Sequence, residues 1–301
     1  MLQKYNSRNA DIKIWVGNGL VSRQDARVSV FDSVVQGGDA VWEGLRIYDG
    51  YVFMLEQHIT RMTESAHALA FAAIHSRDTI KKAIFATLEA NGMRNEAHIR
   101  LTLTRGEKIT SGMDPRLNQS GCTLIVLAEW KPPVYDNNKG IRLITSAIRR
   151  NNPQFLDSKI HHNNLLNNIL AKIEANVAGA DDALMLDTNG FVAETNATNL
   201  FMVKNDTLYT PFADACLPGI TRRLVIDMAT ELSIPIKEKN LSLTEFYNAD
   251  EVFTTGTMGE LTPVQEIDGR LITNKANTTL LPGLQGHFVT KIPLFGVKLP
   301  F

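Results

Sequence analysis

Residues 158–172 read SKIHHNNLLNNILAK, and the interpretation of the whole chain depends on this stretch. Lys159 stands before two histidines and a group of asparagines, and apolar residues then recur at the spacing of a helix. The segment alone leaves three interpretations open: a solvated charge, a neighbour of a histidine metal site, or an amine that bonds covalently to a carbonyl compound. The third requires an amine whose pKa is lowered by burial or by nearby positive charge.

Strand and helix patterns alternate on both sides of this segment. Strands are expected at 12–16, 26–32, 98–106, 121–130 and 141–148, hairpins about Asp49-Gly50 and Asn189-Gly190, and helices at 56–71, 77–92, 163–179 and 217–232. The stretch KPPVYDNNKG at 131–140 breaks both periodicities and is typical of a linker. We therefore predict a mixed α/β protein with a small N-terminal domain (1–128), an interdomain loop (129–140) and a larger C-terminal domain (141–301).

The composition excludes several classes of protein. The 301 residues carry a formal net charge of −1 and no basic stripe, so nucleic-acid binding is not expected. No apolar run of ~18 residues predicts a membrane span, and the first residues lack the apolar core of a signal peptide. The two cysteines, Cys122 and Cys216, lie far apart and outside any CxxC pattern. They predict neither a disulfide framework nor a zinc site, and they suit a cytoplasmic protein.

Sequence motifs for metals and nucleotides are absent, but two turns are suited to an anion. No HExxH, GxxxxGK[ST] or strand-following GxGxxG occurs, and adjacent His161 and His162 point to opposite sides of an extended chain, so no metal site is expected. The segment Pro218–Thr221 lies where a helix begins, and backbone N–H groups there favour phosphate. The segment Thr255–Thr257 offers hydroxyls and an unobstructed backbone after a strand.

Six motifs, in one order, identify a family. They are GDAVWEGLRIYDG, FMLEQHITRM, SKIHHNNLLNNILAK, DTNGFVAETNATNLFMV, LPGITR and TTGTMGELTPV. Together they resemble the fold-type IV pyridoxal-phosphate aminotransferases, with the nearest likeness to branched-chain aminotransferase-like proteins. The resemblance implies a two-domain fold: a smaller N-terminal α/β domain, and a larger C-terminal domain with a β-barrel-like sheet and helices.

The resemblance also implies the site residues. Lys159 is the catalytic lysine that binds pyridoxal 5'-phosphate as a Schiff base, Glu194 pairs with the pyridine nitrogen, and Arg61 binds the phosphate. A carboxylate keeps that nitrogen protonated, and a guanidinium matches a phosphate in geometry and charge. The remaining cofactor contacts are Leu217 against the ring, and Ile220, Thr221, Gly256 and Thr257 around the phosphate.

The substrate pattern departs from the family at several positions. Trp42 replaces a phenylalanine, His98-Ile99-Arg100 replaces a Tyr-x-Arg, and Asn164 stands where a tyrosine is usual. The candidate substrate contacts are Trp42, His98, Arg100 and Met258. Branched-chain L-amino acids with 2-oxoglutarate as acceptor fit the overall resemblance best, and Trp42 offers an apolar wall. The alternatives are a D-amino-acid transaminase, an aminodeoxychorismate lyase and a non-catalytic relative.

The family likeness further implies a ping-pong cycle with amino-acid and 2-oxo-acid substrates, and a homodimer. Residues 280–301 contain three prolines, and Pro293 and Pro300 argue against the uninterrupted helix with which family members usually end. Two alternatives stay open for the last residues: they are disordered, or they pack apolar side chains on a partner. No role follows for His161 or His162.

Overall fold

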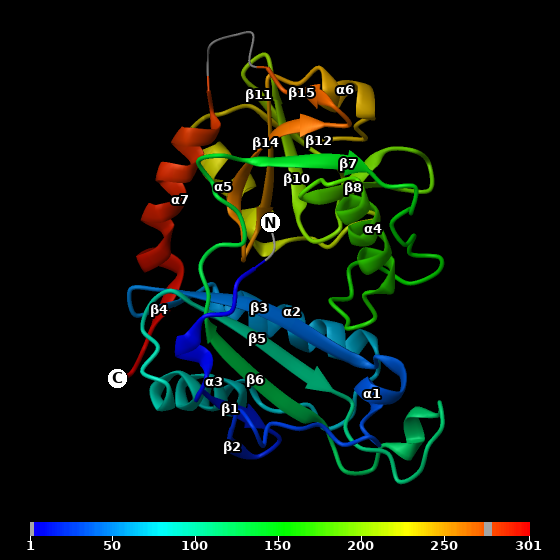
Figure 1. Ribbon diagram of the computed structural model, residues 1–301, viewed down its shortest axis with the longest axis vertical. Helices are drawn as coiled ribbons and strands as arrows, with labels where there is room; N and C mark the ends of the chain where they lie inside the picture. The colour runs from blue at the N-terminus through cyan, green and yellow to red at the C-terminus, as the bar shows by residue number, and fades with distance from the viewer. Residues whose placement is uncertain (1–2, 274–278) are drawn as a thin grey trace. The chain divides into compact units, whose positions relative to one another are not determined.

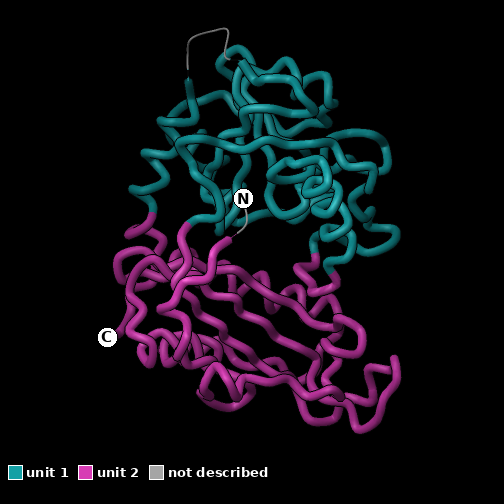
Figure 2. Tube along the Cα trace, viewed as in Figure 1, with its two compact units in different colours: residues 1, 133–159, 165–291 teal, residues 2–132, 160–164, 292–301 magenta. Residues whose placement is uncertain are grey.

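A computed structural model describes residues 3–273 and 279–301, which form two compact units (Figure 2). Unit 1 contains 133–159 and 165–291, and unit 2 contains the rest of the described chain up to 132 together with 160–164 and 292–301. Each unit is thus assembled from separate segments, whereas the predicted domains are continuous ranges. The chain enters unit 2 directly after Lys159.

Unit 2 is built on a seven-stranded antiparallel sheet in the order β16-β4-β3-β5-β6-β1-β2 (Figure 1). Its strands are β1 (Lys13–Val16), β2 (Gly19–Ser22), β3 (Ala40–Tyr48), β4 (Tyr51–Phe53), β5 (Ala97–Thr104), β6 (Thr123–Trp130) and β16 (Gly296–Lys298). The expected hairpin about Asp49-Gly50 is confirmed: both residues have positive φ, 45° and 84°, as a tight two-residue β-turn requires.

One face of this sheet carries the core of unit 2. The helices α2 (Leu55–Ala68) and α3 (Arg77–Ala90) pack their apolar stripes against it, so that Ile59, Met62 and Ile84 are fully buried. The short elements of the unit are α1 (Ser33–Gly37) and two 3₁₀ turns, η1 (Ser7–Asn9) and η2 (Pro115–Leu117). The strand alternation places Trp42 and Arg100 on the opposite face of the sheet from this core.

The strand predicted at 26–32 is wrong. Apart from an isolated bridge between Asp32 and Glu107, this segment is irregular, and Val30 and Phe31 are 71% and 46% exposed. Alternating apolar residues predict a strand only where a neighbouring strand accepts the backbone hydrogen bonds, and none of the described strands runs beside this segment.

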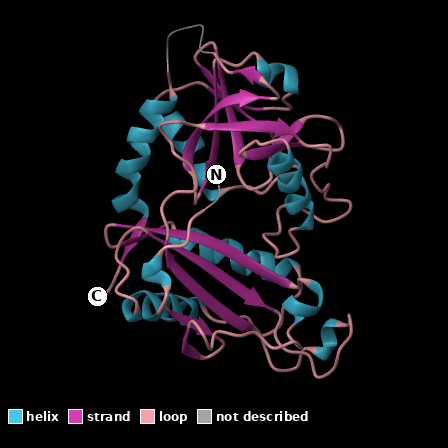
Figure 3. Cartoon of the chain, in the orientation of Figure 1, coloured by secondary structure: helices cyan, strands magenta, loops and turns pink. Residues whose placement is uncertain are grey.

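Unit 1 is built on a mixed, curled sheet in the order β12-β11-β10-β13-β14-β7-β8-β9, with β15 paired to β14 (Figure 3). Its strands are β7 (Ile141–Thr145), β8 (Asp182–Leu186), β9 (Val192–Thr195), β10 (Asn199–Lys204), β11 (Thr207–Thr210), β12 (Ile236–Glu238), β13 (Glu251–Gly256), β14 (Glu260–Ile267) and β15 (Arg270–Leu271). Together with the antiparallel sheet and helices of unit 2, this gives the predicted mixed α/β class.

The helices of unit 1 are α4 (Leu166–Val177), α5 (Ile220–Glu231), α6 (Leu243–Tyr247) and α7 (Leu281–Phe295), the last of which continues into unit 2. Helix α4 packs the small residues Ala171 and Ala175 on β8. Its larger apolar side chains are exposed instead, at 50% for Ile173 and 85% for Val177. A helical apolar stripe therefore predicts the helix here but not which face is buried.

The expectation of an interrupted C-terminal helix is also wrong, because α7 contains Pro293. The helix ends at Phe295, so the hydrogen bond that proline removes belongs to its last turn. The chain then pairs as β16 with β4. No helix within the described residues has both the length and the apolar character needed to cross a membrane.

Candidate active site

A buried carboxylate–guanidinium pair forms the centre of the site in unit 1. Glu194 lies in β9 and is 5% exposed, and its Oε1 accepts from Nε of Arg150 at 2.6 Å. Arg150 is 7% exposed and also donates to Oδ1 of Asn167 at 2.8 Å. A lone buried carboxylate would be costly, and Arg150 places the opposite charge beside Glu194.

Asn199 connects this pair to the start of α5. Its side-chain amide donates to Glu194 Oε2 at 3.3 Å and to the carbonyl oxygen of Leu217 at 2.9 Å. A Cβ on Gly219 would lie 2.0 Å from Asn199 Oδ1, so only glycine fits this close approach. The predicted residues Glu194 and Leu217 are therefore brought together, with Asn199 between them.

The start of α5 and the end of β13 supply hydrogen-bond donors suited to a phosphate. Gly219 caps the helix without a side-chain hydrogen bond, and the first N–H groups, including those of Ile220 and Thr221, have no acceptor inside the helix by its geometry. Thr255 pairs with Asn199 across the sheet, and its Oγ1 is buried without a hydrogen-bond partner in the described structure. Gly256 and Thr257 follow it directly. This donor set fits the phosphate of the expected cofactor.

Lys159 and Met258 complete the predicted residues of unit 1. Lys159 is exposed in the loop between β7 and α4, and its backbone N–H donates to Asp157 Oδ1 at 2.9 Å. Its amine makes no hydrogen bond to any residue that the structure describes. Met258 lies in the turn between β13 and β14, and its carbonyl oxygen accepts from the backbone N–H of Val134 at 3.0 Å.

Arg61, the predicted phosphate ligand, belongs to unit 2 and binds a second buried carboxylate. Its Nε and Nη2 donate to Oε1 and Oε2 of Glu43 at 2.8 and 2.6 Å. Glu43 is fully buried on the core face of β3. Burial alone raises the pKa of Glu43, but His161 and Arg61 reverse that effect and hold the pKa well below its usual range. The carboxylate is therefore ionised at neutral pH.

The candidate substrate residues of unit 2 lie together on the other face of the sheet. The indole Nε1 of Trp42 donates to the carbonyl oxygen of His162 at 3.1 Å, and Cζ of Arg100 lies 3.3 Å from the indole ring centre. Burial lowers the pKa of Arg100 to about 10. Burial and the positive charge of Lys131 lower the pKa of His98 to about 3, and its Nε2 has no partner among the described residues. This face can accept an anionic group.

Three site residues were missed by the sequence reasoning: Glu43, Arg150 and Asn199. Glu43 had a signal, because it interrupts the apolar strand AVWEGLRIY on the face that alternation assigns to the core. Arg150 and Asn199 had none, because Arg150 meets Glu194 44 residues away, and Asn199 joins Glu194 to Leu217, which lies 18 residues further along the chain.

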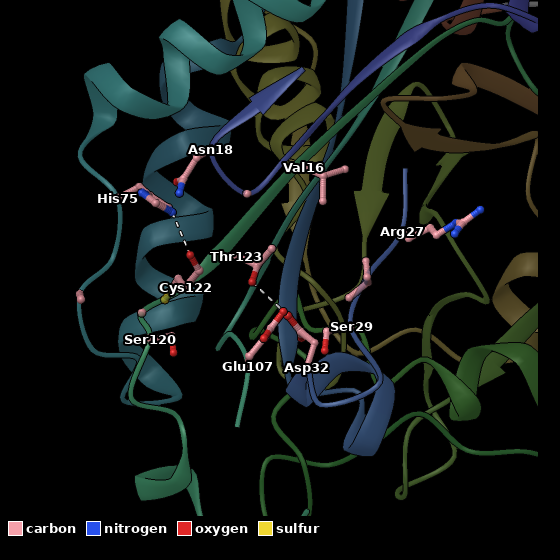
Figure 4. Close-up of a pocket in the computed structure, with 14 residues that line it drawn as sticks. Val16, Asn18, Arg27, Ser29, Asp32, His75, Glu107, Ser120, Cys122 and Thr123 are labelled. Atoms are coloured by element: carbon pink, nitrogen blue, oxygen red, sulfur yellow. Dashed lines mark hydrogen bonds between the residues drawn. The ribbon is translucent and has the colours of Figure 1, made fainter. Parts of the chain in front are cut away.

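A separate pocket of about 500 Å³ lies in unit 2 and contains none of the predicted site residues (Figure 4). Its buried carboxylate, Asp32, is satisfied by the hydroxyls of Thr104 and Thr123, and His75 bonds the carbonyl oxygen of Cys122. Burial raises the pKa of the Cys122 thiol to about 11, which makes it a poor nucleophile. Within the described residues, no three histidine, cysteine or carboxylate side chains are grouped to hold a metal ion.

Comparison with known proteins gives a consistent result. The family description "Amino-transferase class IV" matches residues 40–267. Branched-chain-amino-acid aminotransferase-like protein 2 of Arabidopsis thaliana is 64% identical over 97% of this chain and 52% of its own length. Branched-chain-amino-acid aminotransferase of Pseudomonas aeruginosa is 36% identical over 86% of each chain. The chain spans about half the length of the two Arabidopsis relatives, at 52% and 53%.

A solved structure matches almost throughout. It is the T.th. branched-chain amino acid aminotransferase complexed with N-(5'-phosphopyridoxyl)-L-glutamate, with a TM-score of 0.88, 31% identity, and coverage of 96% of this chain and 99% of that one. The antiparallel sheet of the N-terminal part and the curled half-barrel of the C-terminal part match this structure, which confirms the predicted fold class.

Proposed function

This chain belongs to the class IV aminotransferase family, and on that premise we propose that it is an enzyme that uses pyridoxal 5'-phosphate to move the amino group of a branched-chain L-amino acid to 2-oxoglutarate. The observation that carries the proposal is the buried Glu194–Arg150 pair, joined through Asn199 to the first turn of α5. It combines a buried, arginine-paired carboxylate with a helix start that is suited to a phosphate, in a single unit.

Each residue has a distinct task in this proposal. When bound, the cofactor withdraws electrons from the substrate Cα. Glu194 would hold a proton at the pyridine nitrogen, with its carboxylate oriented by the 2.6 Å hydrogen bond from Arg150. The N–H groups of Ile220 and Thr221 at the start of α5 are suited to bind the phosphate, and the family resemblance assigns Arg61 to the phosphate as well. Lys159 holds the cofactor covalently and, once released, moves a proton from the substrate Cα.

The substrate class is supported by the relatives' names and by the polarity of one face of unit 2. Several matching proteins are named branched-chain aminotransferases. Trp42 is held by His162 and Arg100 and offers a rigid apolar wall to an aliphatic side chain. Arg100 and His98 offer donors to a carboxylate on the same face.

The proposal is tested by the visible spectrum of the protein loaded with pyridoxal 5'-phosphate, recorded before and after adding L-leucine or D-alanine. Loss of the cofactor's visible band with L-leucine alone supports branched-chain L-amino acids. Loss with D-alanine alone assigns the protein to the D-amino-acid group. No change with either, in protein that binds the cofactor, contradicts a transaminase of either kind.

We further propose that the enzyme is a cytoplasmic homodimer. The family resemblance supports the dimer, and the two free cysteines suit a reducing compartment. Light scattering after gel filtration would test the dimer, and a monomeric mass with full activity would contradict it.

A further inference from the structure

We infer that Glu43 is a positioning residue, which sets the orientation of Arg61 and, through His161, joins that arginine to the segment following Lys159. This inference rests on the proposed function, in which Arg61 binds the cofactor phosphate. All the contacts that support it lie within unit 2.

The two carboxylate oxygens of Glu43 each have two hydrogen-bond contacts from the protein. Oε1 faces Nε of Arg61 at 2.8 Å and Nδ1 of His161 at 3.2 Å. Oε2 faces Nη2 of Arg61 at 2.6 Å and Nδ1 of His58 at 2.7 Å. A carboxylate accepts about four hydrogen bonds, so this one is saturated. If Arg61 rotated away, two acceptor positions of a fully buried charge would lose their donors.

Both histidines are neutral at pH 7. Burial lowers the pKa of His58, and it lowers the pKa of His161 to about 4 even though Glu43 acts to raise it. Since a carboxylate only accepts, Nδ1 of His58 carries the proton in that ring. Nδ1 of His161 lies 3.2 Å from Glu43 Oε1 and 3.3 Å from Arg61 Nη2, so it donates to Glu43 in one tautomer and accepts from Arg61 in the other. The cluster therefore contains one positive charge, on Arg61, and one negative charge, on Glu43. Glu43 weakens the attraction of Arg61 for a phosphate, and what it contributes is a fixed geometry.

The segment 160–164 is held on β3 by its backbone as well as by His161. The backbone N–H of Trp42 donates to the carbonyl oxygen of His161 at 2.9 Å, and that of Asn163 donates to Ala40 at 2.8 Å. The His161 ring lies 4.2 Å from the Trp42 ring, centre to centre. Lys159 is only two residues before His161, so one carboxylate holds both the phosphate ligand and the anchor of the lysine segment.

A purely electrostatic role of Glu43 and a positioning role predict opposite results for Glu43→Gln. Removing the negative charge would tighten phosphate binding if Glu43 acted only electrostatically. If it positions Arg61, the affinity for pyridoxal 5'-phosphate falls about tenfold or more. The affinity for pyridoxal, which has the same ring without the phosphate, then changes by less than about twofold. Dissociation constants of both compounds for the cofactor-free full chain give the answer.

Control variants distinguish a positioning effect on Arg61 from a non-specific loss of affinity. Glu56→Gln, on the same helix as Arg61 and ion-paired to Arg77, keeps both affinities unchanged. In an Arg61→Gln background, Glu43→Gln adds no further loss of pyridoxal 5'-phosphate affinity, because the group that it positions is gone. Unchanged or tighter binding by Glu43→Gln, equal losses for both compounds, or additive losses would overturn the inference.

His161 provides a second pair of variants in case Glu43→Gln does not fold. His161→Leu removes the Nδ1 contacts to Glu43 and Arg61 and weakens pyridoxal 5'-phosphate binding about threefold to tenfold. His161→Asn keeps an N–H at the position of Nδ1 and restores most of the affinity. Equal affinities in these two variants would overturn the role of His161. A wild-type chain in which borohydride reduction attaches no cofactor to Lys159 would overturn the proposed function itself, and this inference with it.

Discussion

The two units each contain a buried glutamate paired with an arginine, and the pairs differ in what the carboxylate connects. Glu43 has two contacts on each oxygen, from Arg61, His58 and His161. Glu194 has a 2.6 Å bond from Arg150 on Oε1 and a 3.3 Å contact from Asn199, which also bonds the segment before α5. In the proposed function the first carboxylate orients its neighbours, while the second acts on the cofactor directly.

Lys159→Ala is expected to have the largest effect on turnover. It leaves both glutamate–arginine pairs in place and so provides the reference for variants of either pair. The variant loses covalent attachment of the cofactor and the group that moves the Cα proton, so turnover falls to background. Both ion pairs remain, and the unfolding midpoint stays within about 1 °C because the side chain is exposed. Turnover with L-leucine and 2-oxoglutarate, followed in parallel with thermal unfolding, measures both. Retained transamination would contradict the central assignment.

Glu194→Gln is expected to give the second largest effect. It tests the difference between the two carboxylates most directly. The neutral amide cannot keep the pyridine nitrogen protonated, so the single-turnover rate at saturating cofactor falls roughly a thousandfold. Glu43→Gln under the same saturating conditions stays within about tenfold of the wild-type rate, because its main effect is on affinity. Rapid-mixing absorbance measures both rates. Equal rate losses in the two variants would remove the distinction between them.

The free energies of unfolding of Arg150→Met and Arg61→Met show how much each ion pair contributes to stability. Arg150→Met leaves Glu194 buried without its cation, and the free energy of unfolding falls by about 3–5 kcal/mol. Arg61→Met lowers the free energy of unfolding by less, because His58 and His161 lie beside Glu43 and can take up a proton. Urea unfolding of both variants at pH 7 provides the values. A larger loss for Arg61→Met would contradict this ranking.

The pH dependence of the stability of unit 2 is the smallest expected effect. Burial lowers the pKa of His58, of His98 to about 3 and of His161 to about 4. The folded state therefore binds fewer protons than the unfolded state below pH ~6.5, so stability is full above that pH and declines as the pH falls toward 4. The slope reaches about 1.4 kcal/mol per pH unit for each histidine.

Hydrogen exchange followed by mass spectrometry at pH 7.5 and 5.5, corrected for the intrinsic rates, would resolve this loss by unit. Unit 1 contains a single histidine among its described residues, His287, which pairs with the partly exposed Glu231. We expect protection to fall in α2, β3 and β5 but not in β9 and α5. Equal loss in both units would show that the three buried histidines do not determine the acid response.

Local patterns in the sequence were sufficient for much of the fold. The Asp49-Gly50 hairpin, helices α2 to α5 and most strands follow from turn chemistry and periodicity, which act over a few residues. The order of the motifs identified the family and pointed to Lys159, Glu194 and Arg61 before any coordinates. The assigned roles of these three residues remain predictions.

Tertiary structure decided the features that depend on residues far away along the chain: strand pairing, the buried face of a helix and the partners of buried charges. The segment 26–32 has the alternation of a strand but no described strand beside it, and α4 buries its alanines while its large apolar residues stay exposed. Arg150 meets Glu194 across 44 positions, and Arg61 meets Glu43 across 18. A buried charge is stable only beside a partner that packing brings to it. The sequence by itself determined which charged groups the chain has, and the fold determined which of them are buried and which groups they are paired with.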